Sequence, residues 1–249
     1  MTEQIIAQRL GIALRQVQGT VRLLRDGATI PFISRYRKEA TGSLDELQVG
    51  AVKEQLDKLT ELEARKQPVL STIGEQGKLT DELRKRIEAC WEAVELEDIY
   101  LPYKPKRRTR ATIAKEKGLD GLADVIRLQL TKKPLEEEAV AYLSEEKGVL
   151  TTAGAIAGAG DILAEAISDE ADYRAYIRKA TLDEGQLLSE AKDEKAQTVY
   201  EMYYHYEEPV KKAAGHRILA LNRGEAEKVL TVRVEAPEER ILRYLEKKD

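Results

Sequence analysis

Apolar residues recur at helical spacing along residues 45–66, and this pattern constrains the fold more than any other feature of the sequence. The series consists of Val49, Val52, Leu56, Leu59 and Leu62. Such spacing places the apolar side chains on one face of a helix and leaves the charged residues between them to solvent. Composition agrees, because 42% of the residues are hydrophobic but only 5% are aromatic. We therefore expect an all-α fold, an elongated multi-helix array with a helix-turn-helix-like start.

The first 26 residues contain a shorter helical pattern that is interrupted at Gly11. Helically spaced apolar residues lie on both sides of this glycine, which predicts two helices with a break at residues 10–12. Ala7, Gly11 and Val17 fit a helix-turn-helix, whereas Thr20 stands where an apolar residue is usual. A plain helical hairpin is the alternative. If the motif reads DNA, the polar residues available to a groove are Arg15, Gln16, Gln18, Arg22 and Arg25.

A short basic turn follows these two helices. Gly27 and Pro31 end the helical pattern, and the next residues include Arg35, Arg37 and Lys38. We take these three cations as candidate contacts with nucleic acid.

The long helix that begins at Asp45 is expected to break at Pro68 and Gly74. Thr80, with two acidic residues behind it, has the features of an N-cap, and we expect a helix from there through Trp91.

A basic loop lies within residues 96–110. Pro102 and Pro105 each remove an amide donor and hold the preceding residue extended. Five cations occur within seven residues, namely Lys104, Lys106, Arg107, Arg108 and Arg110. Extended backbone presents them along a line, as phosphates are presented along a strand, and Tyr100 and Tyr103 are near enough to stack on bases. The alternative is a solvated loop that pairs with the acidic helices of residues 134–249.

The second half of the chain contains one small-residue segment and one strand pattern. Gly154, Gly158 and the alanines around them predict a smooth helix face for close packing within 151–168. Residues 169–213 are expected to be mostly helical. The strand pattern at 229–235 is the only clear one, and it needs a partner elsewhere or beyond the C-terminus. The chain is therefore expected to be a fragment of a longer protein.

Charge is distributed unevenly along the sequence. Residues 1–133 contain 25 Lys and Arg against 20 Asp and Glu, whereas residues 134–249 contain 16 against 25. A polyanion would be attracted to the first part and repelled by much of the second. By pattern we divide the chain into 1–66, 67–133 and 134–249.

Several classes of site have no support in the sequence. Cys90 is the only cysteine and has no base near it in the sequence, and His205 and His216 do not form a metal-binding motif. We expect no metal, no cofactor and no catalytic residue. The start has no secretory signal pattern, and no apolar run is long enough for a membrane helix, so a cytoplasmic protein is expected.

Four motifs resemble the N-terminal region of the bacterial Tex family of transcription accessory proteins. They are RYRKEATGSLD at 35–45, LEDIYLPYKPKRRTRATIA at 96–114, GAGDILAE at 158–165 and HRILALNRGE at 216–225. The resemblance covers nearly the whole chain. The sequence departs from it just before His216, where Ala-Ala-Gly stands in place of the expected proline and serine.

The resemblance implies an elongated, mostly helical, cytoplasmic protein that binds nucleic acid and is connected with transcription. Family members continue into a ribonuclease-H-like domain of the YqgF type, helix-hairpin-helix modules and an S1 domain, which the family is thought to use most for RNA binding. We therefore expect a non-enzymatic scaffold with a secondary phosphate contact. The alternative is a protein-interaction scaffold that docks to RNA polymerase or to those further domains without touching nucleic acid.

Overall fold

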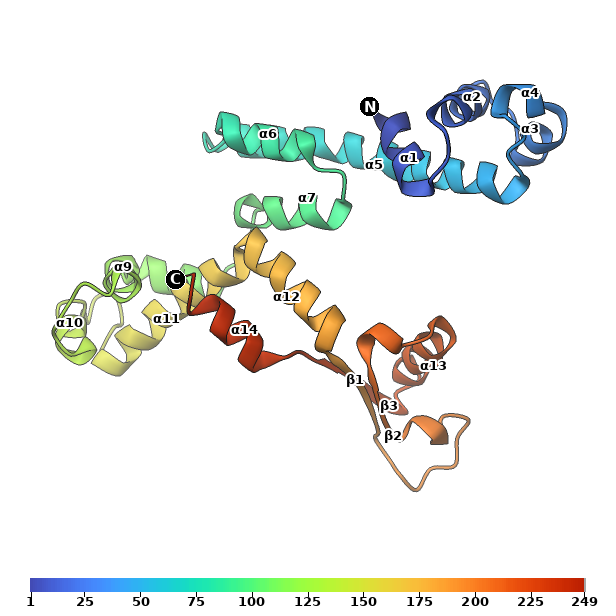
Figure 1. Cartoon of the computed structure of the whole chain (residues 1–249). Helices are drawn as coiled ribbons and strands as arrows, with labels where there is room; N and C mark the ends of the chain where they lie inside the picture. The colour runs from blue at the N-terminus through green and yellow to red at the C-terminus, as the bar shows by residue number, and fades with distance from the viewer. Residues whose placement is uncertain (249) are drawn as a thin grey trace. The chain divides into compact units, whose positions relative to one another are not determined.

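The computed structural model of the protein describes residues 1–248 and consists mostly of helices, as predicted. It divides into two compact units, Met1–Tyr103 and Lys104–Asp249, which we describe separately (Figure 1). The described residues form fourteen α-helices and one three-stranded sheet. Within them, no helix is both long and apolar enough to cross a bilayer.

The first unit is built on one long helix, α5, whose predicted apolar face is buried. Helices α1, α2 and α3 pack along one part of α5, and α6 and α7 contact another part (Figure 1). The elements are α1 (Thr2–Leu10), α2 (Leu14–Arg25), α3 (Ile30–Tyr36), α4 (Lys38–Thr41), α5 (Glu46–Glu75), α6 (Asp81–Ala89), α7 (Ala93–Tyr100) and a 3-10 turn, Leu101–Tyr103.

Helix α5 continues through Pro68 and Gly74, so the predicted break there is wrong. A proline inside a helix removes one hydrogen bond and costs roughly 3 kcal/mol. Val69 and Ile73, which follow Pro68 on the same helix, are completely buried. Burial of these side chains outweighs the local preference against proline.

A buried lysine joins α5 to the last turn of α6 and to the segment that follows it. The Lys66 side chain is only 2% exposed, and its Nζ donates to the Glu88 carbonyl at 2.9 Å and to Glu63 Oε1 at 2.7 Å. The same ammonium lies 4.2 Å from the centre of the Trp91 ring. A charge is tolerated in this position because it is paired, hydrogen-bonded and covered by an aromatic face. The predicted helix through Trp91 ends two residues earlier, at Ala89, and Cys90 is extended.

Helices α1 and α2 meet at the predicted break. Gly11 has a φ of 64°, in the left-handed region that favours glycine, and the Ile12 amide donates to the Ala7 carbonyl at 3.1 Å. Thr20 occupies a buried position in α2 because its Oγ1 donates to the Gln16 carbonyl at 2.8 Å, which satisfies the hydroxyl. The choice between a helix-turn-helix and a plain hairpin stays a prediction.

Helix α4 lies against α2 at a glycine. A methyl group placed on Gly19 would lie 2.0 Å from the Ala40 carbonyl oxygen, so only glycine allows the two backbones to approach this closely. Gln16 supports the same contact, since its Nε2 donates to the Gly42 carbonyl at 2.9 Å. This packing fixes the short basic turn that contains α4 onto the second helix.

The second unit begins with four helices that share a core and continues into a helix pair and a small sheet. Its helices are α8 (Arg110–Glu116), α9 (Asp120–Leu128), α10 (Leu135–Val140), α11 (Thr152–Asp169), α12 (Ala171–Glu184), α13 (Gly215–Ala226) and α14 (Glu238–Leu245). Its strands are β1 (Gln186–Ala191), β2 (His205–Pro209) and β3 (Leu230–Glu235), with 3-10 turns at Glu201–Tyr203 and Val210–Lys212.

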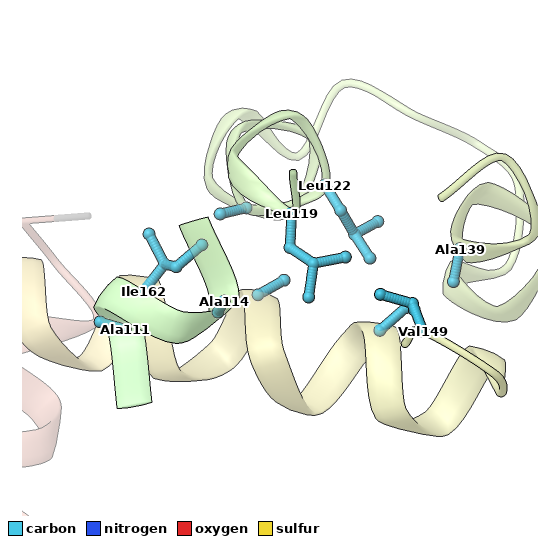
Figure 2. Packing of buried hydrophobic residues seen from close by; sticks show 10 residues of the cluster. Ala111, Ala114, Leu119, Leu122, Ala139, Val149 and Ile162 are labelled. Carbon is cyan, nitrogen blue, oxygen red and sulfur yellow. The ribbon is translucent and has the colours of Figure 1, made fainter. Parts of the chain in front are cut away.

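The small-residue face of α11 packs closely against α8 and α9, as predicted. Ala155 and Ala159 are completely buried there, and Leu119 and Leu122 point onto this helix from the α9 side (Figure 2). A methyl group on Gly158 would lie 2.4 Å from Leu119 Cδ1. Small side chains on α11 therefore allow larger ones on its neighbours to fill the core.

The sheet corrects the prediction of a single strand. Strand β3 forms as predicted, but its partner β1 lies within the chain and pairs with β2 on its other side, all antiparallel. The expectation that 169–213 is mostly helical is therefore wrong for β1 and β2. Neither strand has clear alternation in sequence, because Leu187 and Leu188 are adjacent and β2 is almost entirely polar.

The chain enters and leaves this sheet at one place. Gln186, the first residue of β1, is paired with Glu235, the last residue of β3. Next to it, α12 and α14 lie side by side, with the rings of Tyr176 and Tyr244 stacked at 3.6 Å between centroids. Arg240 of α14 bonds Glu184 of α12 and adds a second contact between these helices.

The close contact at Gly19 can be tested with two glycine substitutions. We expect Gly19→Ala to lower the free energy of unfolding by about 1–3 kcal/mol, because the new methyl group meets a backbone carbonyl. Gly50→Ala in α5 is the matched control, since open space surrounds that position, and it should raise stability by roughly 0.5–1 kcal/mol. Urea unfolding of both variants measures the difference. Equal effects would contradict the packing of α4 on α2.

The Cys90 thiol is buried, and this burial raises its pKa, which suits packing rather than nucleophilic chemistry. Its Sγ donates to the Glu92 carbonyl at 3.2 Å. We expect an aromatic disulfide reagent at pH 8 to label the native protein at least roughly tenfold more slowly than the urea-unfolded chain. Similar labelling rates in the two states would show that the thiol is accessible.

Candidate nucleic-acid interface

The predicted basic loop is present at the start of the second unit. Residues 104–109 form neither helix nor strand, and α8 begins at Arg110 with Thr109 as its N-cap. Thr109 Oγ1 accepts a hydrogen bond from the Thr112 amide at 3.0 Å, which fixes where the loop ends. Four of the five cations lie on this loop, the fifth, Arg110, is the first residue of α8, and all five residues are exposed.

Three of the five loop cations are already paired with acidic side chains. Lys106 Nζ bonds Asp169 and lies 3.8 Å from Glu165 Oε1, and Arg110 Nε lies 3.6 Å from Asp161 Oδ1. The remaining pair joins Arg108 Nη2 to Glu116 Oε2 at 2.7 Å.

The acids at 161, 165 and 169 are spaced by four residues and form a stripe along α11. This acidic stripe, Asp161, Glu165 and Asp169, neutralises part of the loop's charge. The pairing corresponds in part to the second interpretation of the loop, a segment held to the acidic helices.

Lys104 and Arg107 have no ion pair with any acid in the described part of the chain, and both are exposed. Their positive charge is therefore available to an external anion. Exposed ion pairs contribute only about 0–1 kcal/mol to stability, so the paired cations can also exchange their acid for a phosphate. Each of them must first break its ion pair, however. The free cations, Lys104 and Arg107, are the stronger candidates for phosphate contact.

The structure corrects the expected role of Tyr100. Its ring is buried, and the Arg65 guanidinium lies 5.4 Å from the ring centre. One face of the ring is therefore covered by a cation and is not open to a base. Tyr103 is half-buried, and its carbonyl accepts a hydrogen bond from Gln76 Nε2 at 2.7 Å. The Tyr100 ring therefore serves the packing of the first unit, whereas the stacking role of the Tyr103 ring stays a prediction.

The prediction that Pro102 holds the preceding residue extended is wrong, because Leu101 has helical backbone angles, φ -51° and ψ -43°, and begins a 3-10 turn. The prolines also carry no signal for burial of the Tyr100 ring.

The second group of predicted contacts lies on α3 and α4 of the first unit. Arg37 is tied to Glu39, with Nε 2.9 Å from Oε1. Arg35 and Lys38 are exposed, and neither forms an ion pair with an acid among residues 1–248. This group is therefore only partly neutralised by its own acid.

The polar face of α2 forms an exposed row in the same unit. Arg15, Gln18, Arg22 and Arg25 follow one another at helical spacing and are exposed. Gln16, the fifth residue predicted to reach a groove, is instead held by Gly42 and by the Ala13 amide. Arg25 lies 3.5 Å from Glu3.

Sequence reasoning missed an aromatic pair on the surface of α3. Phe32 and Tyr36 are 45% and 69% exposed, and their ring centroids are 5.6 Å apart. A spacing of four residues on a helix was the available signal, together with the fact that Phe32 is the only phenylalanine of the chain.

The histidines do not form a metal centre in the structure. No cluster of three or more His, Cys, Asp or Glu side chains suited to a metal ion occurs in residues 1–248. His205 Nε2 lies 3.4 Å from Glu194 Oε1, and both side chains are exposed.

Comparison with known proteins identifies two matching family models. Residues 1–74 match the Tex-like protein N-terminal domain, and residues 130–248 match a Tex central region-like model.

Individual relatives match across nearly the whole chain. An uncharacterised protein of Bacillus subtilis, YdcI, is 47% identical over 99% of this chain and 35% of its own length. The transcriptional accessory protein Tex of Neisseria gonorrhoeae is 43% identical over 92% of this chain and 30% of its own length. The human S1 RNA-binding domain-containing protein 1 is 31% identical over 93% of this chain and 24% of its own length. The chain thus spans about a third or less of the relatives it matches.

Proposed function

This chain belongs to the Tex family, and we propose that it is a non-enzymatic helical scaffold of a transcription-associated protein that binds nucleic acid. Its own contribution is a secondary, sequence-independent contact with phosphates. The name of the Neisseria relative supports a link with transcription, and that of the human relative supports RNA as a ligand of the whole protein. A role in transcription implies a cytoplasmic location and contact with the transcription machinery.

The observation that carries the proposal is the pair of free cations on the loop of residues 104–109, which forms neither helix nor strand. Lys104 and Arg107 present positive charge without an acid partner among residues 1–248, and no helix or strand of the loop is shaped to enter a groove. Such side chains bind phosphate oxygens and do not distinguish bases. The contact is therefore weak and dependent on salt. It is secondary to other parts of the whole protein that bind nucleic acid more tightly.

The proposal assigns no catalytic residue. The thiol of Cys90 is buried, and His205 faces a carboxylate at the surface rather than a nucleophile. The role we assign to these helices is to hold charged side chains in place.

A second candidate function has its own support in the ion pairs. Because Lys106, Arg108 and Arg110 bond acids of the same unit, the loop is also suited to a structural role. In that case the chain is a protein-interaction scaffold that docks to RNA polymerase or to other domains and leaves nucleic acid to them.

Salt dependence of binding distinguishes these two functions. Each phosphate contact with a single strand contributes a slope of about -0.7 to the plot of log K against log salt. We expect Lys104→Ala/Arg107→Ala to flatten this slope by about 1.4 for a labelled single-stranded RNA, with an unchanged helical circular dichroism signal. Fluorescence anisotropy titrations between low and moderate salt measure the slope.

The matched control for this pair is Lys106→Ala/Arg110→Ala, which removes the same charge from the same loop. Because both of these cations are paired in the structure, the control should change the slope less. If neither double variant changes it while binding persists, the loop is structural, and the second candidate function is favoured.

Removing acids from α11 should have the opposite effect. We expect Glu165→Gln/Asp169→Gln to release Lys106, tighten RNA binding and steepen the slope by about 0.7. Glu136→Gln/Glu137→Gln in α10 removes two exposed acids that are not paired with the loop and serves as the control for net charge. Equal effects of the two variants would mean that only the overall charge matters.

A further inference from the structure

We infer that Phe32 and Tyr36 form a stacking site for the unpaired bases of single-stranded nucleic acid. The inference rests on the nucleic-acid binding proposed above, but it concerns the other unit and a different kind of contact. The loop supplies charge for phosphates, whereas this pair supplies flat apolar faces for bases.

Helix α3 presents the pair outward and holds it in place. Thr29 caps the helix, and its Oγ1 accepts a hydrogen bond from the Phe32 amide at 3.4 Å. Ile33 and Ser34 are buried and fix the opposite side of the helix against the rest of the unit. Phe32 and Tyr36 lie one helical turn apart, with 42° between their ring planes. The two rings therefore offer neighbouring, inclined faces at the surface.

Packing of the protein does not explain this exposure. The chain contains few aromatic residues, and none of its ten other tyrosines is as exposed as Tyr36. Four of them are buried, namely Tyr100, Tyr200, Tyr203 and Tyr204, and the other six are half-buried. The only phenylalanine is instead half exposed beside an even more exposed tyrosine. An exposed aromatic cluster of this kind marks a surface for binding rather than for folding.

The charge around the pair indicates what it binds. Residues 1–44 contain seven Lys and Arg against three Asp and Glu. Two of those acids are engaged locally, Glu39 by Arg37 and Glu3 by Arg25. Arg35 and Lys38 flank Tyr36 along the chain and have no acid partner among residues 1–248. Aromatic faces next to unpaired cations match the two parts of a nucleotide, its base and its phosphate.

A single strand fits this surface better than a duplex. Bases inside a duplex are already stacked on one another, so a surface ring reaches only a base that is unpaired. Stacking on an aromatic face tolerates any base, because every base has a π-face. The site should therefore bind single strands with little preference for sequence.

The experiment compares two ligands that differ only in their bases. We expect the full 249-residue chain to bind a labelled 12-nucleotide oligothymidylate about tenfold more tightly than an abasic strand of the same length, measured by fluorescence anisotropy. Phe32→Leu/Tyr36→Leu keeps apolar bulk but removes the rings, and it should abolish this difference. Urea unfolding midpoints verify that the double variant is folded.

Charge and stacking are separated by a second pair of variants. Arg35→Ala/Lys38→Ala should weaken binding of both ligands and flatten the salt slope while the preference for the strand with bases remains. Lys211→Ala/Lys212→Ala, which removes two exposed cations of the second unit, is the matched control.

A direct optical signal comes from Tyr36→Trp. Stacking should quench the fluorescence of the new indole with the oligothymidylate but not with the abasic strand. The native protein, whose only tryptophan is Trp91, gives the background signal.

Each result has a defined meaning. Binding that is equal for the two ligands, or a base preference that survives loss of both rings, would overturn the stacking site and leave the loop contact standing. In that case the exposed rings become a candidate contact for a protein. Failure to bind either strand at low salt would overturn the phosphate contact as well.

Discussion

Close packing at two glycines determines where the candidate contacts of this protein lie. In the first unit, Gly19 lets α4 settle on α2, which fixes the basic turn and its neighbour α3 beside that helix. In the second unit, Gly158 makes room for Leu119 against α11, and α8 packs on the same helix directly after the basic loop. At both places a single methyl group would occupy the space of an existing atom. The charged surfaces therefore depend on two positions at which a side chain larger than that of glycine has no room.

Helix α11 combines two roles because its faces differ. One face consists of alanine and glycine and is buried against α8 and α9. The other bears Asp161, Glu165 and Asp169, which hold Lys106 and Arg110 of the loop. The same helix thus provides the core that positions the loop and the negative charge that reduces its attraction for polyanions. Weakened attraction of this kind is consistent with the secondary contact that we propose.

Residues with strong local signals predicted the structure well. The apolar spacing from Val49 to Leu62 predicted the buried face of α5, Thr80 predicted the start of α6, and Gly11 predicted the end of α1. The predictions failed where contacts between residues far apart in the sequence determine the local structure. Packing continues α5 past Pro68, and Arg65 covers the ring of Tyr100. Strands form from sequences without alternation because β1 pairs with β3 and β2 pairs with β1. The partners of Lys106 and Arg110 lie some fifty or more residues away, so spacing within the loop cannot reveal which cations are free.

The chain enters and leaves the small sheet at the same place, so residues 186–235 branch off from the helical part of the second unit and return to it at one point. Gln186 and Glu235 are adjacent at its base, and α12 and α14 are joined there by Arg240 and by the stacked rings of Tyr176 and Tyr244. The path of the chain through α12 and α14 therefore does not depend on how long this segment is. In topological terms, residues 186–235 are an insertion between two helices that contact each other. Segments within it, such as the loop between β1 and β2, can lengthen or shorten without displacing α12 and α14.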